Sequence, residues 1–445
     1  MSNVLSKAIY TLWDTKEGGI RLKEMDNLQK LQFQSIEAIE QHQLVRLKKL
    51  IEHAYKNSPW YRKKFISLGL TLSDFNTIKD LEKLPVTTKL DIRNNGDDFI
   101  AETSNKSELV IAKTGGSTGV SLNLYFDDLC QKMRNAAQGF ADGFAGWVPG
   151  DKIGALWGNP PVATTLKQKL RSTLLEKTKY LDTMDLNPRS MSTFANEWQK
   201  FTPDVLFGHA HSIFIFAKYL LDNNTKLTSP KGIVATSMML LDHERKVIEE
   251  AFGAKVTNRY GCEEVGLIAC ECEEHDGMHI NTPHIVLECV DDNDNPVPFG
   301  TSGKLVVTDL NNFAMPLIRY RIEDVGVLTD KQCSCGRKLP LLEKLEGRVA
   351  DFLKKVDGGL VGGVSLVERT LTDIPGIEQM QLIQKQLDKI IINRVKGQDF
   401  NQETDSELLK EMHVVFGDAV EIKINDITEM PQEASGKYRF SICEV

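Results

Sequence analysis

Five short runs of apolar and β-forming residues recur between residues 109 and 237, and segments with helical spacing separate them. Alternation of this kind is typical of an α/β domain whose strands are largely buried. The pattern therefore predicts an α/β fold. The runs are 109–112, 122–126, 152–157, 205–209 and 232–237.

The 445 residues exceed what a single compact core contains, so we expect two or three domains. Apolar residues at helical intervals over 22–57 predict one or two amphipathic helices. Closely spaced strand signals over 280–330 predict a small antiparallel β subdomain over about 280–345. The expected organisation is a large N-terminal α/β domain over 1–347, a hinge at 346–359 and a small mobile α+β domain over 348–445. Strand candidates in the small domain are 379–385, 389–397 and 419–426, with a helix near 402–413.

Acidic residues outnumber basic ones, 62 against 54, which gives a formal net charge of −8. No basic stretch is interleaved with aromatic residues, so nucleic acid is not an expected partner. The N-terminus lacks the apolar core and the small-residue cleavage site of a signal peptide, and nowhere do eighteen apolar residues run together. We therefore expect a cytoplasmic protein without a membrane span.

The segment TGGSTG at 114–119 follows the first strand candidate. Its glycines let backbone N–H groups approach an anion closely, and its hydroxyl groups add further donors, which suits a triphosphate. It is not a Walker loop, because GxxxxGK[ST] is absent, and a flexible turn is the alternative interpretation. The glycines are Gly115, Gly116 and Gly119, and the hydroxyl residues are Thr114, Ser117 and Thr118.

Three further motifs contain residue types that a nucleotide site needs. In NRYGCEE at 258–264, Tyr260 is a candidate to stack on a base and Glu264 to hold Mg²⁺ between phosphates, with a solvated acidic loop as the alternative. Asp324 in YRIED is a candidate for ribose hydroxyls, with a surface salt bridge as the alternative. Lys437 in SGKYR is a candidate mobile charge for a phosphate or carboxylate, although most lysines are solvated surface residues.

Cysteine and histidine cluster in two places that lie far apart in the sequence. In a reducing compartment such clusters suggest metal before disulfide. Three thiolates and one imidazole suit a tetrahedral zinc ion, which would be structural because the protein supplies every ligand. The candidate ligands are Cys272, His279, Cys333 and Cys335, with Cys270 or His275 as replacements in the first cluster.

In this order the motifs resemble those of the adenylate-forming superfamily of acyl-CoA synthetases, and within it the phenylacetate-CoA ligase family and its capsule-locus members. The resemblance covers nearly the whole chain and implies an ATP-dependent carboxylate ligase of the AMP-forming class. It also includes AYKNSPWYRKKF and DLEKLPVTTKLDIR near the N-terminus, then AMPLIRYRIEDVG, CSCGRKLP, LEGRVADFL and SGKYRFSICEV.

The resemblance implies a two-step reaction. A carboxylate attacks the α-phosphate of ATP to give acyl-AMP and pyrophosphate, and the thiol of CoA then displaces AMP. Glu264 would bind Mg²⁺, and Lys437 would bridge the acyl carboxylate and the α-phosphate during the first step. The small domain would then rotate and carry Lys437 away.

The resemblance also implies which residues meet the nucleotide and the acid. The glycine-rich segment would hold phosphate. His209 and His211 lie in a segment where relatives line the acyl pocket, which suggests a polar or anionic acid, although core or helix-cap histidines are the alternative. The remaining nucleotide residues would be Tyr260 at adenine, Asp324 and Arg348 at ribose, and Ser237 and Gly261 beside them.

Several positions depart from the family pattern, among them Glu263, where Ser or Thr is usual, and Ala350, where a charged hinge residue is frequent. These changes leave adenylation as the expectation and the acceptor open. An amine or a carrier thiol is the alternative acceptor, in surface-polysaccharide or secondary-metabolite synthesis. A catalytically silent nucleotide-binding homologue is the third alternative, and either a monomer or a homodimer is expected.

Overall fold

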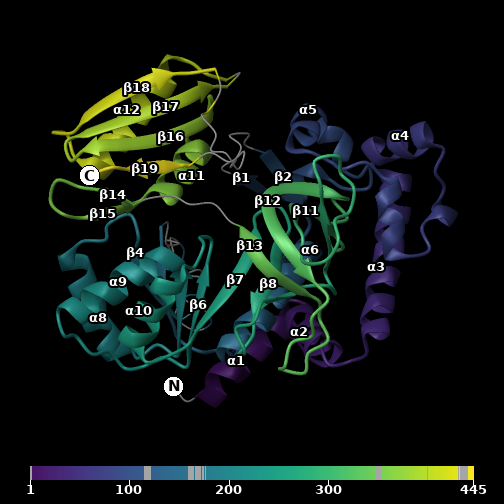
Figure 1. Cartoon of the computed structure of the whole chain (residues 1–445), viewed down its shortest axis with the longest axis horizontal. Coiled ribbons are helices and arrows are strands. Elements are labelled where there is room, and N and C mark those ends of the chain that lie inside the picture. The colour runs from purple at the N-terminus through teal and green to yellow at the C-terminus, as the bar shows by residue number, and fades with distance from the viewer. Residues whose placement is uncertain are drawn as a thin grey trace. The chain divides into compact units, whose positions relative to one another are not determined.

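The structure is a computed structural model of the whole chain, and it divides into two compact units (Figure 1). The first unit comprises Met1–Ala112, Leu122–Pro149 and Thr257–Gly347, and the second comprises Lys113–Ser121, Gly150–Val256 and Arg348–Val445. The residues that the structure describes are 3–114, 122–158, 165, 172, 175, 177–346, 352–397, 399–428, 430 and 439–445.

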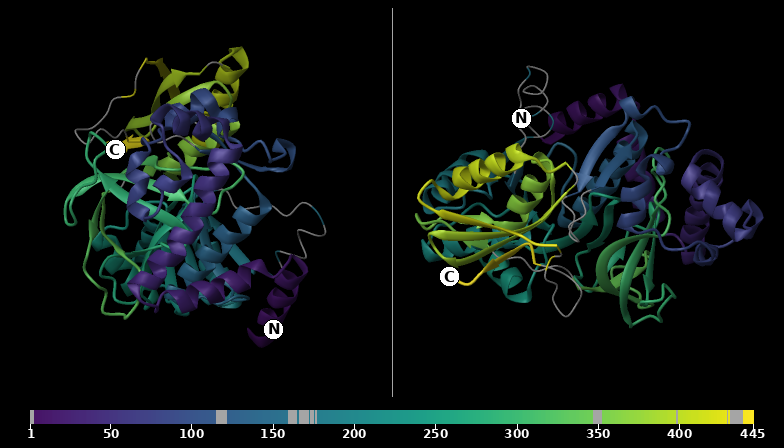
Figure 2. Two further views of the ribbon diagram at one scale, coloured as in Figure 1. Left: turned by 90° about the vertical axis from the view of Figure 1, so that its right-hand side faces the viewer. Right: turned by 90° about the horizontal axis from the view of Figure 1, so that it is seen from above.

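Helices form the N-terminal part of the first unit. The predicted amphipathic stretch over 22–57 becomes α2 and α3, and α3 runs along one side of the strands of this unit (Figures 1 and 2). Ser35 caps α3 by accepting a hydrogen bond from the backbone N–H of Ala38, and Pro59 begins α4, where its missing N–H costs nothing. The helices are α1 Asn3–Lys16, α2 Ile20–Leu31, α3 Ile36–Asn57, α4 Pro59–Leu68, α5 Lys89–Phe99 and α6 Asp128–Asp142, with 3₁₀ turns at Leu72–Asp74, Ile78–Lys83, Lys106–Glu108 and Gly143–Ala145.

Antiparallel strands form the sheet of the first unit, in the order β10-β11-β12-β13-β9-β8-β7. Three of them, β10 to β12, fall in the region from 280 to 330 where the sequence predicts close-spaced strands. The short strands β1 and β2 pair separately. The bounds are β1 Val110–Thr114, β2 Leu122–Phe126, β7 Val256–Cys262, β8 Gly266–Glu271, β9 Met278–Ile280, β10 Ile285–Val290, β11 Ser302–Asp309, β12 Tyr320–Thr329 and β13 Leu341–Glu346.

Four parallel strands organise the second unit, in the order β6-β5-β3-β4. Three helices pack against one face of them, around Trp198, Phe216 and Ile248, which are fully buried. The α/β expectation for this part of the chain is confirmed. The bounds are β3 Ile153–Trp157, β4 Thr178–Asp182, α8 Pro188–Phe201, β5 Val205–His209, α9 Ala210–Asp222, β6 Gly232–Thr236 and α10 Asp242–Phe252.

The C-terminal part of the second unit is a mixed sheet in the order β18-β17-β16-β19, with two helices. The three predicted strands and the predicted helix are found as β16, β17, β18 and α12, and Asn401 caps α12. The hairpin of β14 and β15 was not predicted, because strands of three residues give no periodic signal. The bounds are β14 Phe352–Lys354, β15 Leu360–Gly362, α11 Gly363–Asp373, β16 Ile377–Gln386, β17 Lys389–Lys396, α12 Gln402–Phe416, β18 Glu421–Asp426 and β19 Ser441–Cys443. Among the described residues, no helix combines the length and the apolar character needed to span a membrane.

Candidate functional site

Glu264 lies in the turn between β7 and β8, and its side chain is almost fully buried. The hydroxyl of Tyr320, the first residue of β12, donates to Glu264 Oε1 over 3.1 Å. Lys89 Nζ lies 3.7 Å from the same oxygen. The predicted alternative of a solvated acidic loop does not apply to this carboxylate, because it is held inside the unit between a hydroxyl and an ammonium group.

Gly261 of β7 allows the chain on the two sides of the Glu264 turn to approach closely, because it has no side chain. A Cβ atom at this position would lie 2.5 Å from the carbonyl oxygen of Gly266, a distance that real Cβ atoms do not show. Arg134 of α6 then clamps the turn from the other side, with Nη1 donating to the Glu263 carbonyl over 3.1 Å and Nη2 pairing with Asp309 at 3.2 Å. The glycine and the buried arginine together fix where Glu264 points.

Tyr260 and Asp324 form a second buried pair in the first unit. The Tyr260 hydroxyl donates to Asp324 Oδ2 over 2.8 Å, from β7 to β12. Asp324 lies four residues after Tyr320 on β12, in a stretch where the pairing of β12 with β11 shifts register. The surface salt bridge considered for Asp324 is therefore not what the structure contains. The predicted residues Tyr260, Glu264 and Asp324 come together in one unit.

Lys89 reaches Glu264 because the segment before it is fastened to the start of β12. Thr87 N–H donates to the Arg319 carbonyl over 2.8 Å, and Arg321 N–H donates to the Thr87 carbonyl over 2.9 Å. Thr88 and Asp91 then form a capping box that begins α5, with Lys89 in its first turn. Lys89 and Tyr320 were not predicted as site residues, although both lie in segments that carry the family resemblance.

In the second unit, His209 ends β5 and His211 lies in the first turn of α9. His209 is buried against the indole of Trp157, with ring centroids 4.3 Å apart, and burial lowers its pKa to about 4. Nδ1 of His211 contacts Oε1 of Glu244, and Oε2 of Glu244 accepts from Leu241 N–H at the start of α10. Glu244 was not predicted as a site residue.

Ser237, a predicted nucleotide residue, follows β6. Its φ of 65° is a left-handed conformation that non-glycine residues rarely adopt.

Several predicted site residues lie outside the part of the chain that the structure describes. Thr114 ends β1, but its side chain is not described. The remaining predictions of this kind are Gly115, Gly116, Ser117, Thr118, Gly119, Arg348 and Lys437. Their roles stay predictions.

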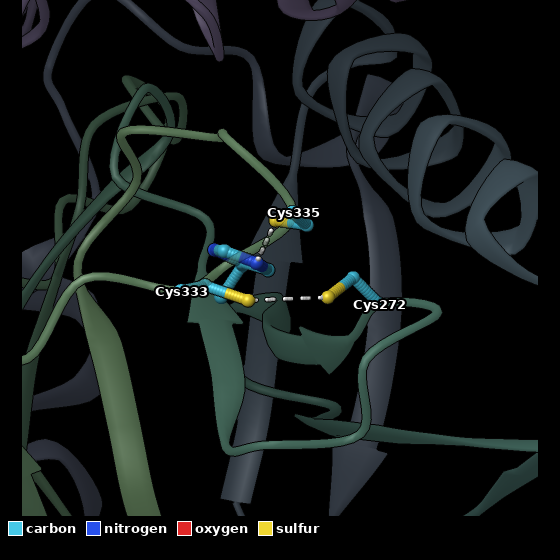
Figure 3. A group of neighbouring side chains, drawn as sticks. Cys272, Cys333 and Cys335 are labelled. Carbon is cyan, nitrogen blue, oxygen red and sulfur yellow. Dashed lines mark hydrogen bonds between the residues drawn. The ribbon is translucent and has the colours of Figure 1, made fainter.

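A cluster of three thiols and one imidazole lies at one end of the antiparallel sheet in the first unit (Figure 3). The ligand atoms of Cys272, His279, Cys333 and Cys335 all lie within 4.8 Å of one another. Cys272 follows β8, His279 is in β9, and the two other cysteines are in the loop between β12 and β13. The pairing of His279 with Leu341 of β13 brings the two sequence clusters together.

The cluster has dimensions that suit a tetrahedral zinc ion. The Sγ atoms of Cys272 and Cys333 are 3.6 Å apart, close to the edge of about 3.8 Å that zinc–sulfur bonds of about 2.3 Å would give. His279 Nε2 lies 3.3 Å from Cys335 Sγ, while Nδ1 faces the Leu339 carbonyl at 3.4 Å, as the second nitrogen of a zinc-bound histidine commonly does.

The two residues considered as replacement ligands are engaged elsewhere in the described part of the chain. Cys270 Sγ lies 3.8 Å from the Ala141 carbonyl, and His275 Nδ1 lies 3.2 Å from a Glu271 carboxylate oxygen. Neither belongs to the group of four. The structure thereby selects one set of candidate ligands among those that the sequence left open.

Comparisons with known proteins agree with these observations. Residues 353–444 match the sequence model of the CapK C-terminal domain. The chain is 27% identical over 427 residues to protein CapK of Staphylococcus aureus, covering 95% of this chain and 90% of the relative. It is 28% identical over 348 residues to the phenylacetate-coenzyme A ligase of Thermus thermophilus, covering 75% of each chain. These matches support the predicted resemblance to the adenylate-forming, phenylacetate-CoA ligase-like family and to its CapK-like members.

A solved structure shows the same fold. A 2-hydroxyisobutyryl-CoA ligase in the postadenylation state superposes with a TM-score of 0.60 at 19% identity, covering 93% of this chain and 91% of the ligase. The expected resemblance, the expected fold class and the expected class of protein, an AMP-forming carboxylate ligase, are confirmed. The domain boundaries and the roles of individual residues stay predictions.

Proposed function

We propose that the protein activates a carboxylic acid with ATP and then transfers the acyl group to CoA. The observation that carries the proposal is the pair of buried contacts in the first unit, Tyr320 with Glu264 and Tyr260 with Asp324. Two carboxylates fixed by tyrosine hydroxyls beside an ammonium group suit a nucleotide and its metal ion better than they suit a merely structural core. Relatives that are named phenylacetate-coenzyme A ligases support the reaction class.

In the first step a carboxylate oxygen of the acid attacks the α-phosphorus of ATP, and the bond to the pyrophosphate oxygen breaks. In the second step the CoA sulfur attacks the acyl carbon, the thiol loses its proton, and the bond to AMP breaks. The first step moves negative charge from the carboxylate to a pyrophosphate oxygen, and the second moves it from the CoA sulfur to a phosphate oxygen of AMP. Fixed positive groups and hydrogen-bond donors are therefore what the protein has to supply.

The residues near Glu264 fit a Mg²⁺ ion. Mg²⁺ prefers hard oxygen ligands and is commonly held by one or two carboxylates together with substrate phosphates, where it offsets phosphate charge. Glu264 would provide such a carboxylate, since Tyr320 fixes the direction of Oε1. Lys89 offsets the Glu264 charge inside the unit, and in this proposal it would be a second positive charge for phosphate oxygens.

The nucleoside end of the site would involve Tyr260 and Asp324. In this proposal the Tyr260 ring faces adenine, while its hydroxyl holds Asp324, whose carboxylate accepts hydrogen bonds from ribose hydroxyls. Residues 114–119 would hold phosphate, Arg348 would assist at ribose, and Lys437 would stabilise the charge that grows as the acid attacks. These last roles rest on the motifs alone.

The acceptor separates the leading proposal from its main alternative. The alternative is transfer to an amine or to a carrier thiol, in surface-polysaccharide or secondary-metabolite synthesis. AMP release in the presence of a competent acid should increase with CoA if the thioester proposal is right. An increase with amines or amino sugars, and none with CoA, would favour the alternative.

Acid-dependent exchange of labelled pyrophosphate into ATP tests the proposal as a whole. A panel of aryl, fatty, amino and sugar acids should contain at least one acid that supports exchange, and Lys437→Ala should abolish it. A matched control is Lys410→Ala on the exposed side of α12, which should leave exchange unchanged. If no acid in a broad panel supports exchange, the result favours the catalytically silent nucleotide-binding homologue and refutes the ligase proposal.

We also propose that Cys272, His279, Cys333 and Cys335 hold a structural zinc ion. The distances and the orientation of His279 support this, and four protein ligands leave no position for a substrate. The ion would fasten the loop between β12 and β13 to the end of β8. Since β8 follows the turn that carries Glu264, the ion would stiffen one wall of the proposed active site.

A further inference from the structure

Two segments that lie far apart in the sequence bring side chains to the same oxygen atom of Glu264. The Tyr320 hydroxyl donates to Oε1 over 3.1 Å, and Lys89 Nζ lies 3.7 Å from that oxygen. Tyr320 begins β12, whereas Lys89 begins α5 directly after residues 84–88, which we call the linking segment. Contacts that hold the linking segment against the start of β12 therefore hold both partners of this carboxylate.

Backbone hydrogen bonds place the linking segment beside β12. Thr87 lies opposite Tyr320 in a parallel bridge, with one hydrogen bond to Arg319 on one side and one to Arg321 on the other. The Thr87 hydroxyl adds a third bond, donating to the Ile318 carbonyl over 3.0 Å. Because a single bridged pair is too short to be stable by itself, side chains have to hold the two segments together.

Arg319 makes this side-chain connection. Its Nη1 donates to the Leu84 carbonyl, at the start of the linking segment, over 2.6 Å, and its Nε donates to the Glu288 carboxylate of β10 over 3.1 Å. The residue is fully buried. A guanidinium group presents several donors in a fixed planar fork, so one side chain can bond a carbonyl and a carboxylate at the same time. Arg319 thereby joins the linking segment to the sheet.

The backbone of Arg319 is unusual as well. Its φ of 50° lies in the left-handed region, which is unfavourable for a residue with a long side chain. The N–H donates to Thr308 Oγ1 of β11 over 2.9 Å, and the carbonyl accepts from Thr87, so contacts on both sides hold this conformation. It sets the direction in which Tyr320 enters β12. Strained residues that their surroundings hold in place cluster at functional sites.

We propose that Arg319 is a positioning residue for Glu264, which places Lys89 through the linking segment and Tyr320 through its own backbone. This inference rests on the proposed function, in which Glu264 binds Mg²⁺. Without both partners in place, Oε1 loses its fixed direction and the carboxylate binds the ion less tightly. Groups that orient a metal ligand commonly contribute about tenfold or more to metal affinity or activity.

Arg319→Lys tests the inference, because a lysine keeps a positive charge beside Glu288 but lacks the fork that also reaches Leu84. The first measurement does not depend on activity. It is the rate at which sulfo-N-hydroxysuccinimide acetate labels Lys89 in the full chain, followed by mass spectrometry. In the unaltered chain Lys89 should be labelled far more slowly than the exposed Lys63, because Lys89 is buried and paired. Arg319→Lys should raise the Lys89 rate several-fold and leave the Lys63 rate unchanged.

The second measurement is the Mg²⁺ concentration that gives half-maximal pyrophosphate exchange. Arg319→Lys should raise it about tenfold, whereas a loss of stability alone would reduce the amount of active protein and leave this concentration unchanged. In a Lys89→Met background the same change should raise it by clearly less, since one of the two contacts is already absent. Arg62→Lys, which alters an exposed pair with Glu102, is the matched control and should change neither measurement.

Thr308→Val provides a second variant if Arg319→Lys does not fold. It removes the acceptor of the Arg319 N–H and nearly keeps the shape of the side chain. Both measurements should change in the same direction as in Arg319→Lys, by a smaller factor, because the guanidinium bonds to Leu84 and Glu288 remain.

The outcomes separate this inference from the proposed function. An unchanged Lys89 labelling rate or an unchanged Mg²⁺ requirement in folded Arg319→Lys would overturn the inference, as would the same result in Thr308→Val if only that variant folds. An equal effect of Arg319→Lys with and without Lys89 would also overturn it. If no acid supports exchange in the unaltered chain, the ligase proposal fails, and the labelling rates alone decide whether Arg319 places Lys89.

Discussion

Lys89 Nζ lies 3.7 Å from Glu264 Oε1, and both side chains are less than a tenth exposed. The lysine comes from the first turn of α5 and the glutamate from the turn after β7, so the pair joins the N-terminal helices to the turn that carries the proposed metal ligand. Two opposite charges at this depth stabilise each other, because each offsets part of the cost of burying the other.

Lys89→Met should therefore both destabilise the protein and impair the site. Removing one partner of a buried ion pair costs about 3–5 kcal/mol of unfolding free energy, which urea denaturation would measure. Lys63→Met, which removes an exposed pair with Asp98, should change the free energy of unfolding by no more than about 0.5 kcal/mol.

A double-mutant cycle makes this prediction stricter. Lys89→Met combined with Glu264→Gln should cost clearly less than the sum of the two single changes, since the double variant buries no unpaired charge. Pyrophosphate exchange should fall in all three variants. Additive costs, or a loss below about 1 kcal/mol for Lys89→Met, would contradict the assignment of a functional ion pair.

The hydroxyl of Tyr260 should matter for nucleotide binding more than for folding. Tyr260→Phe keeps the ring and removes the hydrogen bond to Asp324, which should cost about 1 kcal/mol of stability. Freed from this bond, the Asp324 carboxylate is less well oriented, so the KM for ATP in the exchange assay should rise several-fold. Tyr219→Phe on α9 of the second unit removes the same atom from a tyrosine that has no role in the proposal, and it should leave KM unchanged. An unchanged KM in Tyr260→Phe would remove Asp324 from the ribose role.

The sequence predicted the elements whose signals are local. The strands β3, β5 and β6 appear where short apolar runs predict them, and Tyr260, Glu264 and Asp324 lie in short motifs in or beside β7 and β12. Their meeting in one unit depends on β7 and β12 approaching one another in the antiparallel sheet, which no local pattern specifies.

What the sequence missed are the contacts between segments that lie far apart along the chain. Lys89 reaches Glu264 only because Thr87 is bonded to the residues before β12. Glu244 reaches His211 from another helix. Such partners have no fixed spacing along the sequence. Charged residues of the same kind are also common on solvated surfaces, so the sequence does not distinguish a buried partner from a surface residue.

Zinc should be found in the purified protein at close to one ion per chain. Cys333→Ser and Cys335→Ser should lose the ion and lower Tm, because each removes a ligand from the group of four. Cys443→Ser, outside the group, should keep both the ion and Tm. A strong chelator should lower the Tm of the unaltered chain toward that of the ligand variants. Protein purified from zinc-supplemented medium that contains no zinc would refute the site.

The stability of the first unit should depend on pH through His284. This fully buried histidine bonds Glu24 through Nε2 at 2.8 Å, and Arg46 pairs with the same carboxylate at 2.8 Å. Burial lowers the pKa of His284, to which the positive charge of Arg46 adds, while Glu24 and Asp309 act in the opposite direction. His42 lies close enough for its charge to act on the same group.

The sign follows from proton binding. A histidine whose pKa is lower in the folded state than its ordinary value near 6.5 binds more protons when unfolded, so the unfolding free energy falls as pH drops below about 6.5. Glu24, whose pKa is about 2, keeps its charge until far lower pH and does not contribute between pH 7.5 and 5.5.

His284→Gln retains an N–H for Glu24 but does not titrate. Between pH 7.5 and 5.5 its unfolding free energy, measured by urea denaturation, should fall less than that of the unaltered chain. His413→Gln, on α12, controls for losing a histidine and should keep the full fall. Identical falls in the unaltered chain and in His284→Gln would mean that other groups, such as the buried His209 and His279, set the pH dependence.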